Sequence, residues 1–159
     1  MKIAYAVTAL FLAPLFASPA LASNAPAQAA VTAASEAEIK AASVPVENYI
    51  KALQTSSIDY ARLAFHKDAR MIGNGRNGFL SMPIEEWMKG LTGTPNADEA
   101  QRKRSFRILD LTATTGVARV ELVYPGVTFI DHMPLLKVDG EWKIMNKFFH
   151  AIRPPVPAN

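Results

Sequence analysis

The sequence predicts an α+β fold, in which helices near the start of the chain cover one face of an antiparallel sheet. Three observations support this class. Helical periodicity is confined to the part before residue 92, and nearly every segment after Arg104 has the alternation of a strand. Asp139 and Gly140 join two such strands with the residues of a tight hairpin turn. Segregated helices and antiparallel strands are typical of α+β domains.

Two consecutive helices are expected first, at residues 43–54 and 58–65. Pro45 suits the first turn of the longer helix, because its missing N–H would have no partner there. A further helical stretch, residues 36–42, can precede it. The apolar residues of the longer helix recur at the spacing of a single face: Val46, Tyr49, Ile50 and Leu53.

The middle of the chain predicts a short hairpin and a third helix. A strand at residues 69–72 leads into a loop at 73–78 with two Asn-Gly pairs, and the chain returns at 79–81. The loop is rich in glycine but lacks the Gly-Lys-Ser/Thr ending of a phosphate site, so we interpret it as a turn. A helix at 83–91 begins with proline and two acidic residues, and 92–100 is a loop.

Four more strands are expected, at residues 106–113, 117–124, 129–138 and 141–150. A two-residue turn at Asp139-Gly140 places Asp131 opposite Phe148. This register predicts the inner face Asp131, Met133, Leu135, Trp142, Ile144, Asn146 and Phe148, next to Ala118, Val120, Leu122 and Tyr124. It predicts the outer face Ile130, His132, Pro134, Leu136, Lys143 and Lys147. A bulge, for which Pro134 is a candidate position, would shift the pairing by one residue.

Asp131 and Asn146 are the two polar residues on this otherwise apolar inner face. Ligand pockets are mostly apolar and contain a few placed polar groups. We therefore interpret the face as the lining of a cavity rather than as a plain core.

The first 22 residues have the features of a secretory signal peptide. Lys2 precedes an apolar run that ends at Phe16, and Ala20-Leu21-Ala22 is a cleavage site of the A-x-A kind. The run is shorter than the ~20 residues that span a bilayer. We expect a periplasmic or secreted protein that has no membrane partner after signal removal. Its expected parts are a flexible leader at 23–35, one domain at 36–152 and a proline-rich tail at 153–159.

Composition excludes several classes of function. A formal net charge of +3 over 159 residues gives no reason to expect a nucleic-acid partner. The chain has no cysteine, and a domain of this size buries a core without disulfides. His66, His132 and His150 lie on different predicted elements, so we expect no metal site. No cofactor is expected.

Three segments resemble the nuclear transport factor 2-like superfamily (the SnoaL-like, ketosteroid-isomerase-like fold), and within it a lumazine-binding-like group. They are residues 44–53 (VPVENYIKAL), 63–69 (LAFHKDA) and 138–144 (VDGEWKI). The resemblance covers residues 43–149. It implies a cone-shaped, strongly curved sheet wrapped around N-terminal helices, with a cavity at its open end. It also implies homodimers through the outer sheet face, where Ile130, Leu136 and Phe149 would be buried.

The resemblance also permits a comparison with ketosteroid isomerase. That enzyme holds an oxyanion with a tyrosine in the first helix and an aspartic acid in a late strand, the places of Tyr49 and Asp131 here. Its carboxylate base follows the first short strand, where residues 71–74 of this chain (Met-Ile-Gly-Asn) contain no acid. Without a base, such a pair cannot move a carbon-bound proton. His66, near Asp68, is the remaining candidate for one.

Nine residues are expected to bind a ligand: Tyr49, Phe65, Met71, Trp87, Tyr124, Asp131, Met133, Asn146 and Phe148. Trp87 and Phe79 could cap the cavity, or they could belong to the core. The one basic run comprises Arg102, Lys103 and Arg104, with Arg107 close by. It is either a solvated strand entrance or a rim that attracts anionic ligands.

Three functions remain open. The first is an exported protein that binds a small, partly apolar molecule without catalysis, and the missing acid–base pair favours it. The second is an isomerase, dehydratase or cyclase that uses Tyr49 and Asp131 with a base such as His66. The third is a dimeric protein-interaction module that uses the outer sheet face.

Overall fold

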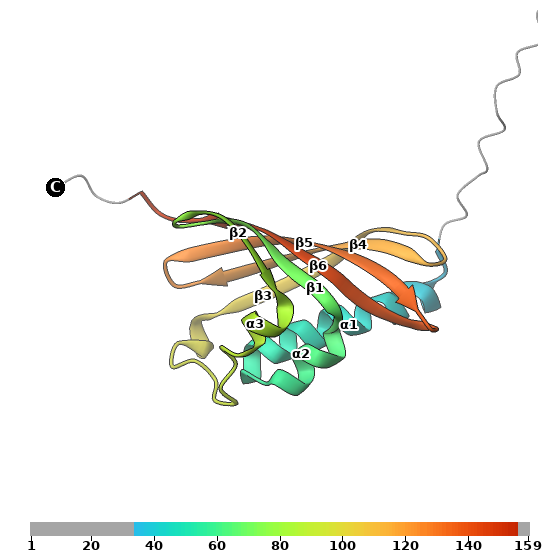
Figure 1. Cartoon of the computed structure of the whole chain (residues 1–159), viewed down its shortest axis with the longest axis horizontal. Helices are drawn as coiled ribbons and strands as arrows, with labels where there is room; N and C mark the ends of the chain where they lie inside the picture. Colours follow the sequence, from blue (N-terminus) through green and yellow to red (C-terminus); the bar gives the residue numbers. More distant parts are fainter. Residues whose placement is uncertain (1–33, 156–159) are drawn as a thin grey trace, which may run out of the picture. The chain divides into compact units, whose positions relative to one another are not determined.

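The computed structural model describes residues 34–155 of the chain. The predicted signal peptide, nearly all of the predicted leader and the end of the tail lie outside the described residues. In the described part, the helices lie against one face of a curved, open, six-stranded sheet (Figure 1). The α+β class expected from the sequence is therefore confirmed.

The first helix, α1, is longer than predicted and runs continuously over Glu36–Thr55. Ser35 caps it, because its side chain accepts a hydrogen bond from the backbone N–H of Glu38 at 3.2 Å. Two acidic residues in the first turn favour the same start. Pro45 lies buried in the helix interior, so the prediction that placed it in a first turn was wrong. The cap that starts the helix is Ser35, ten residues before Pro45, and the buried apolar face of α1 helps to offset the hydrogen bond that an interior proline removes.

The other helices are short. They are α2 (Ile58–Ala64), α3 (Ile84–Met88) and the 3₁₀ turn η1 (Glu99–Gln101). Phe65, predicted at the end of a helix, instead begins a strand. The third helix is shorter than the predicted span of 83–91, and η1 lies at the end of the predicted loop.

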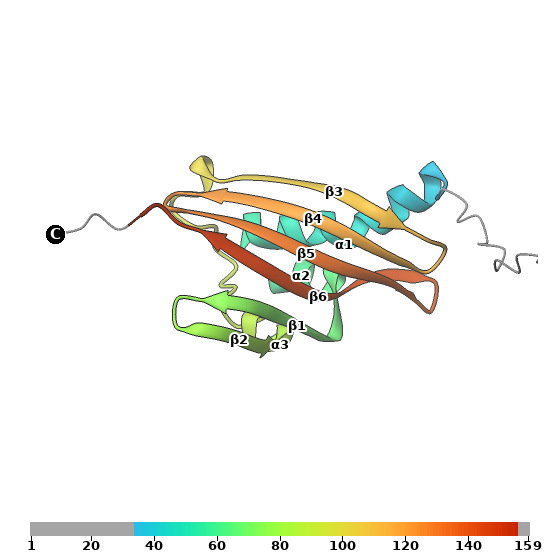
Figure 2. The same ribbon diagram turned by 90° about the horizontal axis from the view of Figure 1, so that it is seen from above.

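Six strands form the sheet: β1 (Phe65–Gly75), β2 (Gly78–Pro83), β3 (Lys103–Leu111), β4 (Thr115–Tyr124), β5 (Val127–Val138) and β6 (Glu141–Ile152). Their order is β2-β1-β6-β5-β4-β3, and Figure 2 shows this order from above. All neighbours are antiparallel except β1 and β6, which are parallel. Hairpin signals identify neighbours along the chain, but this parallel pair joins segments far apart in the sequence, so the sequence did not reveal it.

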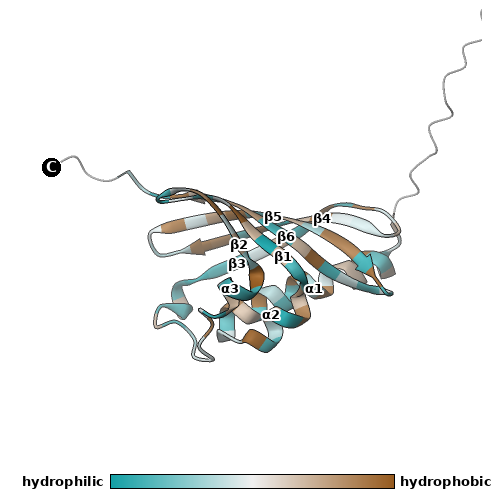
Figure 3. Cartoon of the chain, viewed as in Figure 1, coloured by the Kyte–Doolittle hydropathy of each residue, from teal (hydrophilic) through white to brown (hydrophobic). Residues whose placement is uncertain are grey.

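The inner face of the sheet packs against α1. Ala118, Val120 and Leu122 of β4 are buried there, as the alternation predicts. Figure 3 shows hydrophobic and hydrophilic residues alternating along the strands. The Asp139-Gly140 turn also forms as predicted, with both residues at positive φ (51° and 85°).

The register of the β5–β6 hairpin changes halfway along. Leu135 pairs with Ile144 as predicted, but His132 pairs with Phe148, and Asp131 therefore pairs with Phe149. Three residues of β6 (145–147) face two of β5 (133–134), so the bulge lies on β6, opposite Pro134. The predicted Asp131–Phe148 pairing was wrong, because one extra residue moves all later side chains of β6 to the other face.

Candidate functional site

Three polar side chains from three elements meet beneath α1. Tyr49 comes from α1, Asp131 from β5 and Lys147 from β6. The Tyr49 hydroxyl donates to Asp131 Oδ2 at 3.0 Å, and Lys147 Nζ donates to the Tyr49 oxygen at 2.7 Å. Lys147 Nζ also lies 2.9 Å from Asp131 Oδ2, which closes the cluster into a triangle. We call these three residues the polar triad.

The triad lies in an apolar interior. Tyr49 and Asp131 are 0% exposed and Lys147 is 6% exposed. Burial, and next the negative charge of Asp131, raise the pKa of the Tyr49 hydroxyl well above its usual range, so it remains a protonated donor at neutral pH. Buried charges occur in proteins when they are paired, as Lys147 and Asp131 are here.

One atom of the triad is not satisfied. Asp131 Oδ1 has no hydrogen-bond partner among residues 34–155. Leaving a buried acceptor unpaired costs roughly 1–3 kcal/mol. A domain built for stability alone would avoid this, so the carboxylate marks the region as a candidate functional site.

A pocket of about 300 Å³ opens beside the triad. Its lining is mostly apolar and aromatic: Tyr49, Leu53, Met71, Gly75, Trp87, Leu122, Tyr124, Phe129, Lys147, Phe149 and Arg153. Tyr49 and Lys147 reach its surface, whereas Asp131 lies behind them and does not line it. A ligand in the pocket would therefore lie next to Tyr49 and Lys147, with Asp131 behind these two residues.

Aromatic rings fix the position of the tyrosine. The Tyr49 ring centroid lies 5.5 Å from that of Phe65, edge to face, and 6.0 Å from that of Trp87. Phe65 and Trp87 also contact each other at 5.9 Å. Such contacts stabilise one ring orientation beyond the area that they bury. The phenol is therefore held rigidly toward the triad.

The predicted basic run lies beside the pocket, but its charges are largely engaged. Arg104 forms a two-pronged pair with Glu99 and donates from Nε to the Tyr124 oxygen at 3.1 Å. Arg102 pairs with Asp98 at 2.8 Å and lies 4.4 Å from the Tyr124 ring centroid. These guanidinium groups hold Tyr124 in place, while the exposed Arg153 is the arginine that lines the pocket.

The nine residues expected to bind a ligand occupy different places in the structure. Tyr49, Met71, Trp87 and Tyr124 line the pocket. Asp131 supports two of the lining groups from behind. Phe65 and Met133 are buried in the core without reaching the pocket surface, and Asn146 and Phe148 lie on the shifted part of β6.

The bulge explains where Asn146 and Phe148 lie. It also explains why the sequence analysis did not place Lys147 and Phe149 in the site. Phe148 is turned outward and is 42% exposed, while Asn146 uses Oδ1 to accept from the backbone N–H of Arg70 at 2.9 Å. Lys147, predicted on the outer face, points inward instead. Phe149, predicted to bury itself in a dimer contact, lines the pocket. One signal in the sequence was available: Pro134, which lies opposite the bulge, has no backbone N–H to donate to the neighbouring strand.

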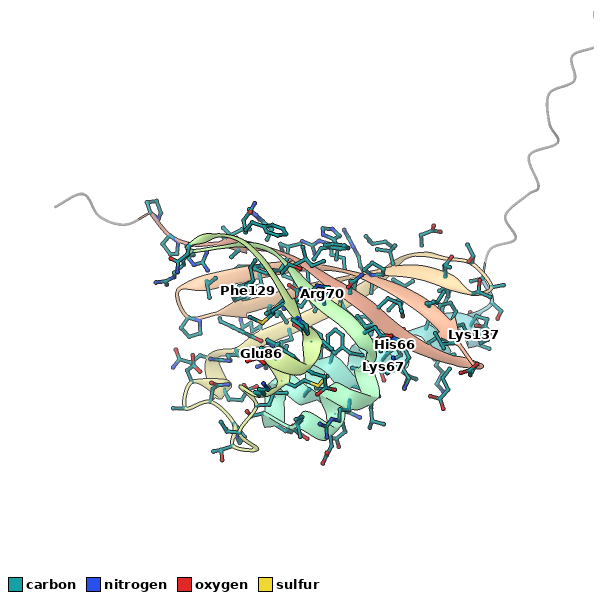
Figure 4. All side chains as sticks on the ribbon, in the orientation of Figure 1. His66, Lys67, Arg70, Glu86, Phe129 and Lys137 are labelled. Carbon is teal, nitrogen blue, oxygen red and sulfur yellow. The ribbon has the colours of Figure 1, made fainter. Side chains whose placement is uncertain are left out.

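His66 lies away from this pocket. It borders a separate recess near the Asp139 turn, and its Nδ1 accepts from the backbone N–H of Asp68 at 3.3 Å. In Figure 4, His66 and Phe129, which lines the pocket, are labelled toward opposite ends of the sheet. Phe79 is 76% exposed and does not line the pocket either.

Two further properties concern the described part of the chain. Residues 34–155 hold no helix whose length and apolar character would let it cross a bilayer. Within the same residues, no three His, Cys, Asp or Glu side chains gather as they would around a metal ion.

Comparisons with known proteins agree on the fold. A family model described as "Putative lumazine-binding" matches residues 37–150. A curated relative, aldolase FrzH from Cladobotryum sp, is 27% identical over 105 residues, which are 65% of this chain and 82% of that protein. The expected nuclear transport factor 2-like fold is confirmed by its solved neighbours.

Two such neighbours are proteins of unknown function. One, from Methylobacillus flagellatus, has a TM-score of 0.64 at 28% identity and covers 77% of this chain and 97% of its own. The other, from Shewanella baltica, has a TM-score of 0.65 at 24% identity and covers 74% and 96%. Both are nuclear transport factor 2-like proteins.

Proposed function

Because the chain belongs to the putative lumazine-binding family of nuclear transport factor 2-like proteins, we propose that its pocket binds a small, partly apolar carbonyl compound. The observation that carries this proposal is the polar triad at the edge of an apolar, aromatic pocket. Pockets of this composition bind the body of a ligand through apolar contacts and orient it with a few polar groups.

The donors of the triad favour a neutral oxygen on the ligand. An ammonium group has three N–H donors. Lys147 donates one to the Tyr49 oxygen and forms an ion pair with Asp131 at 2.9 Å, so at least one donor remains for a ligand. The charges of Lys147 and Asp131 already cancel, so at the triad a second anion would be repelled by Asp131, and the positive charge of Arg153 belongs to an exposed residue. A ketone or aldehyde oxygen satisfies the donor without adding charge.

The pocket volume limits the size of the ligand. About 300 Å³ is at the lower end of the ~300–1,000 Å³ range of small-molecule sites. An aromatic ring with a short carbonyl-bearing chain fits this space. Trp87, Phe129 and Phe149 offer faces and edges for such a ring.

An enzyme that acts next to a carbonyl group is the second candidate. Similarity to a protein named as an aldolase supports it. The isomerase variant of this hypothesis has less support, because neither His66 nor any carboxylate reaches the pocket surface. We also propose that the protein works after export, since residues 1–22 have the features of a signal peptide.

Tryptophan fluorescence tests the binding proposal. Benzylacetone, a methyl ketone that carries a phenyl ring at the end of its chain, is titrated into the mature protein, and quenching of Trp87 reports entry into the pocket. A Trp87→Phe variant identifies the source of the signal, since the chain has one other tryptophan at Trp142. We expect saturable quenching, and we expect Lys147→Met to lower the affinity for benzylacetone at least tenfold. Lys143→Met is the matched control on the same strand and should bind as the wild type does.

Absence of saturable quenching by benzylacetone and by its phenol and carboxylic acid analogues would overturn the proposal. If only the carboxylic acid saturates, the site binds anions and the argument from charge cancellation is wrong.

A further inference from the structure

We propose that Lys147 is a nucleophile that forms an imine with the carbonyl group of its ligand, and that the protein thereby makes or breaks a carbon–carbon bond of the aldol type. This inference rests on the proposed function, because it requires a carbonyl compound in the pocket.

The position of Lys147 carries the argument. It is the one lysine among the described residues that lines this pocket, and its residue is 6% exposed. Its amine lies over the rings of Tyr49 and Phe129, 5.2 Å and 5.9 Å from their centroids. Lysines that form imines with carbonyl substrates are found in hydrophobic pockets of this kind.

The bulge in β6 has a function in this proposal. Without the extra residue at 145–147, Lys147 would point to the outer face and Phe148 to the inner one. Bulges are frequent next to active sites, where they re-aim a side chain. Here the bulge brings a single amine into an otherwise apolar lining.

Asp131 and Tyr49 supply the proton path that imine formation needs. Asp131 Oδ2 lies 2.9 Å from Lys147 Nζ and can accept the proton that the ammonium must lose. The Tyr49 hydroxyl contacts both groups, at 3.0 Å and 2.7 Å, and lines the pocket. It can therefore pass a proton between the carboxylate and a ligand oxygen that lies beside Lys147.

The step is balanced in atoms and charge. Lys147 gives one proton to Asp131, and its neutral nitrogen attacks the carbonyl carbon to form a carbinolamine. Asp131 and Tyr49 pass this proton to the former carbonyl oxygen, and Asp131 then takes a second proton from nitrogen and passes it along the same path, so that the oxygen leaves as water. A C=N bond replaces the C=O bond, and the positive charge stays on nitrogen beside the carboxylate.

This iminium ion accepts electrons from the adjacent carbon. In the cleavage direction, the bond between the α and β carbons breaks, and its electron pair forms an enamine. The β-hydroxyl loses its proton to the Tyr49–Asp131 pair and leaves as an aldehyde. The same proton then returns to the α carbon, and water hydrolyses the imine to release the ketone and Lys147.

Reductive trapping tests the inference. The full mature protein is incubated with benzylacetone and sodium cyanoborohydride, and intact mass and peptide mapping locate the adduct. We expect one adduct per chain, on Lys147, whose mass is that of the ketone less one oxygen atom. Lys147→Arg keeps a cation beside Asp131 but cannot form an imine, and should lose the adduct. Lys143→Arg makes the same substitution four residues earlier on β6 and should retain it.

A second readout tests the reaction class. The aldol adduct of acetone and benzaldehyde is the substrate, and benzaldehyde release is followed by absorbance. We expect release by the wild type and by Lys143→Arg, and at least a hundredfold slower release by Lys147→Arg. Tyr49→Phe should still form the reduced adduct, but more slowly, because its proton path is interrupted.

The outcomes separate the two proposals. Saturable quenching by benzylacetone with no adduct, or with an adduct spread over surface lysines, overturns the imine and leaves the binding proposal intact. An adduct on Lys147 without benzaldehyde release overturns the aldol reaction. If benzylacetone causes no quenching and forms no adduct, both proposals are overturned. Peptide mapping of the wild type decides the question even if Lys147→Arg does not fold.

Discussion

Lys147 and Asp131 form an ion pair in the interior of the domain, with 2.9 Å between Nζ and Oδ2 and almost no exposure to solvent. Buried pairs of this kind add little net stability, because desolvation of both charges offsets their attraction. The pair also leaves Asp131 Oδ1 without a partner among residues 34–155. A pair that contributes little stability and leaves an acceptor unsatisfied is more readily explained by a role in the pocket.

Removal of one partner is expected to destabilise the protein. Asp131→Leu leaves the Lys147 charge buried without a counter-ion, and breaking a buried pair in this way costs ~3–5 kcal/mol. Unfolding in urea, followed by circular dichroism, should show a matching fall in the free energy of unfolding.

The double variant Asp131→Leu with Lys147→Met is the control, because it removes both charges together. It should regain most of the loss, since apolar replacements of a whole buried pair are often neutral. A double variant no more stable than Asp131→Leu alone would show that the loss comes from misfit of the leucine and not from the unpaired charge.

The stability of the protein should fall as the pH rises above about 10, the usual tyrosine pKa. Burial raises the pKa of Tyr49 in the folded state, so above pH 10 the unfolded chain loses a proton that the folded chain keeps. The folded state then binds more protons than the unfolded state, and alkali favours unfolding. Below the tyrosine pKa of the unfolded chain, protonated Tyr49 makes its full contribution to stability.

Urea midpoints measured across this range, for the wild type and Tyr49→Phe, test the sign. The urea midpoint of Tyr49→Phe should fall less steeply with pH, because this variant lacks the Tyr49 hydroxyl. Tyr124, whose pKa burial also raises, remains in both proteins and accounts for a residual slope. Equal slopes in the two proteins would mean that Tyr49 ionises as readily in the folded state as in the unfolded one.

The sequence predicted the parts of the fold that depend on local patterns. The Asp139-Gly140 turn, the inner face of β4 and the meeting of Tyr49 with Asp131 follow from turn chemistry, alternation and the family resemblance. The parallel pairing of β1 with β6 did not follow, because it joins segments that neither a turn nor a crossover motif connects.

The most informative error concerns Lys147. An alternation that is correct as far as Ile144 places this residue outside, and one inserted residue places it in the pocket. The bulge is supported by a contact that the sequence does not encode locally: Asn146 Oδ1 accepts from the Arg70 backbone N–H on the parallel neighbour β1. Strand register can therefore depend on long-range pairing, and a site that depends on register is hard to predict from sequence alone.

This contact leads to a prediction about Asn146. Asn146→Ala removes the acceptor at 2.9 Å and leaves the Arg70 N–H unpaired in a half-buried position, at a cost of ~1–3 kcal/mol. Amide hydrogen exchange at Arg70 should accelerate, and imine trapping at Lys147 should weaken as the bulge loses its support. Asn146→Asp keeps an oxygen acceptor and should restore both. If the alanine variant exchanges as slowly as the wild type, the bulge does not depend on this bond.

A final prediction concerns Gly73, which lies opposite Phe149 in the parallel pair. A Cβ at position 73 would lie 2.6 Å from the Phe149 backbone oxygen and 2.7 Å from its ring, closer than packed atoms allow. Gly73→Ala should therefore displace the Phe149 ring from the pocket wall, lower stability by ~1–3 kcal/mol and weaken benzylacetone binding. Gly75→Ala, on the same strand, is the control for stability alone, because its Cβ would lie 3.7 Å from the nearest atom but at the lining of the pocket. We expect this variant to unfold at the wild-type urea concentration. If Gly73→Ala did the same, close approach of the two strands would not be what positions Phe149.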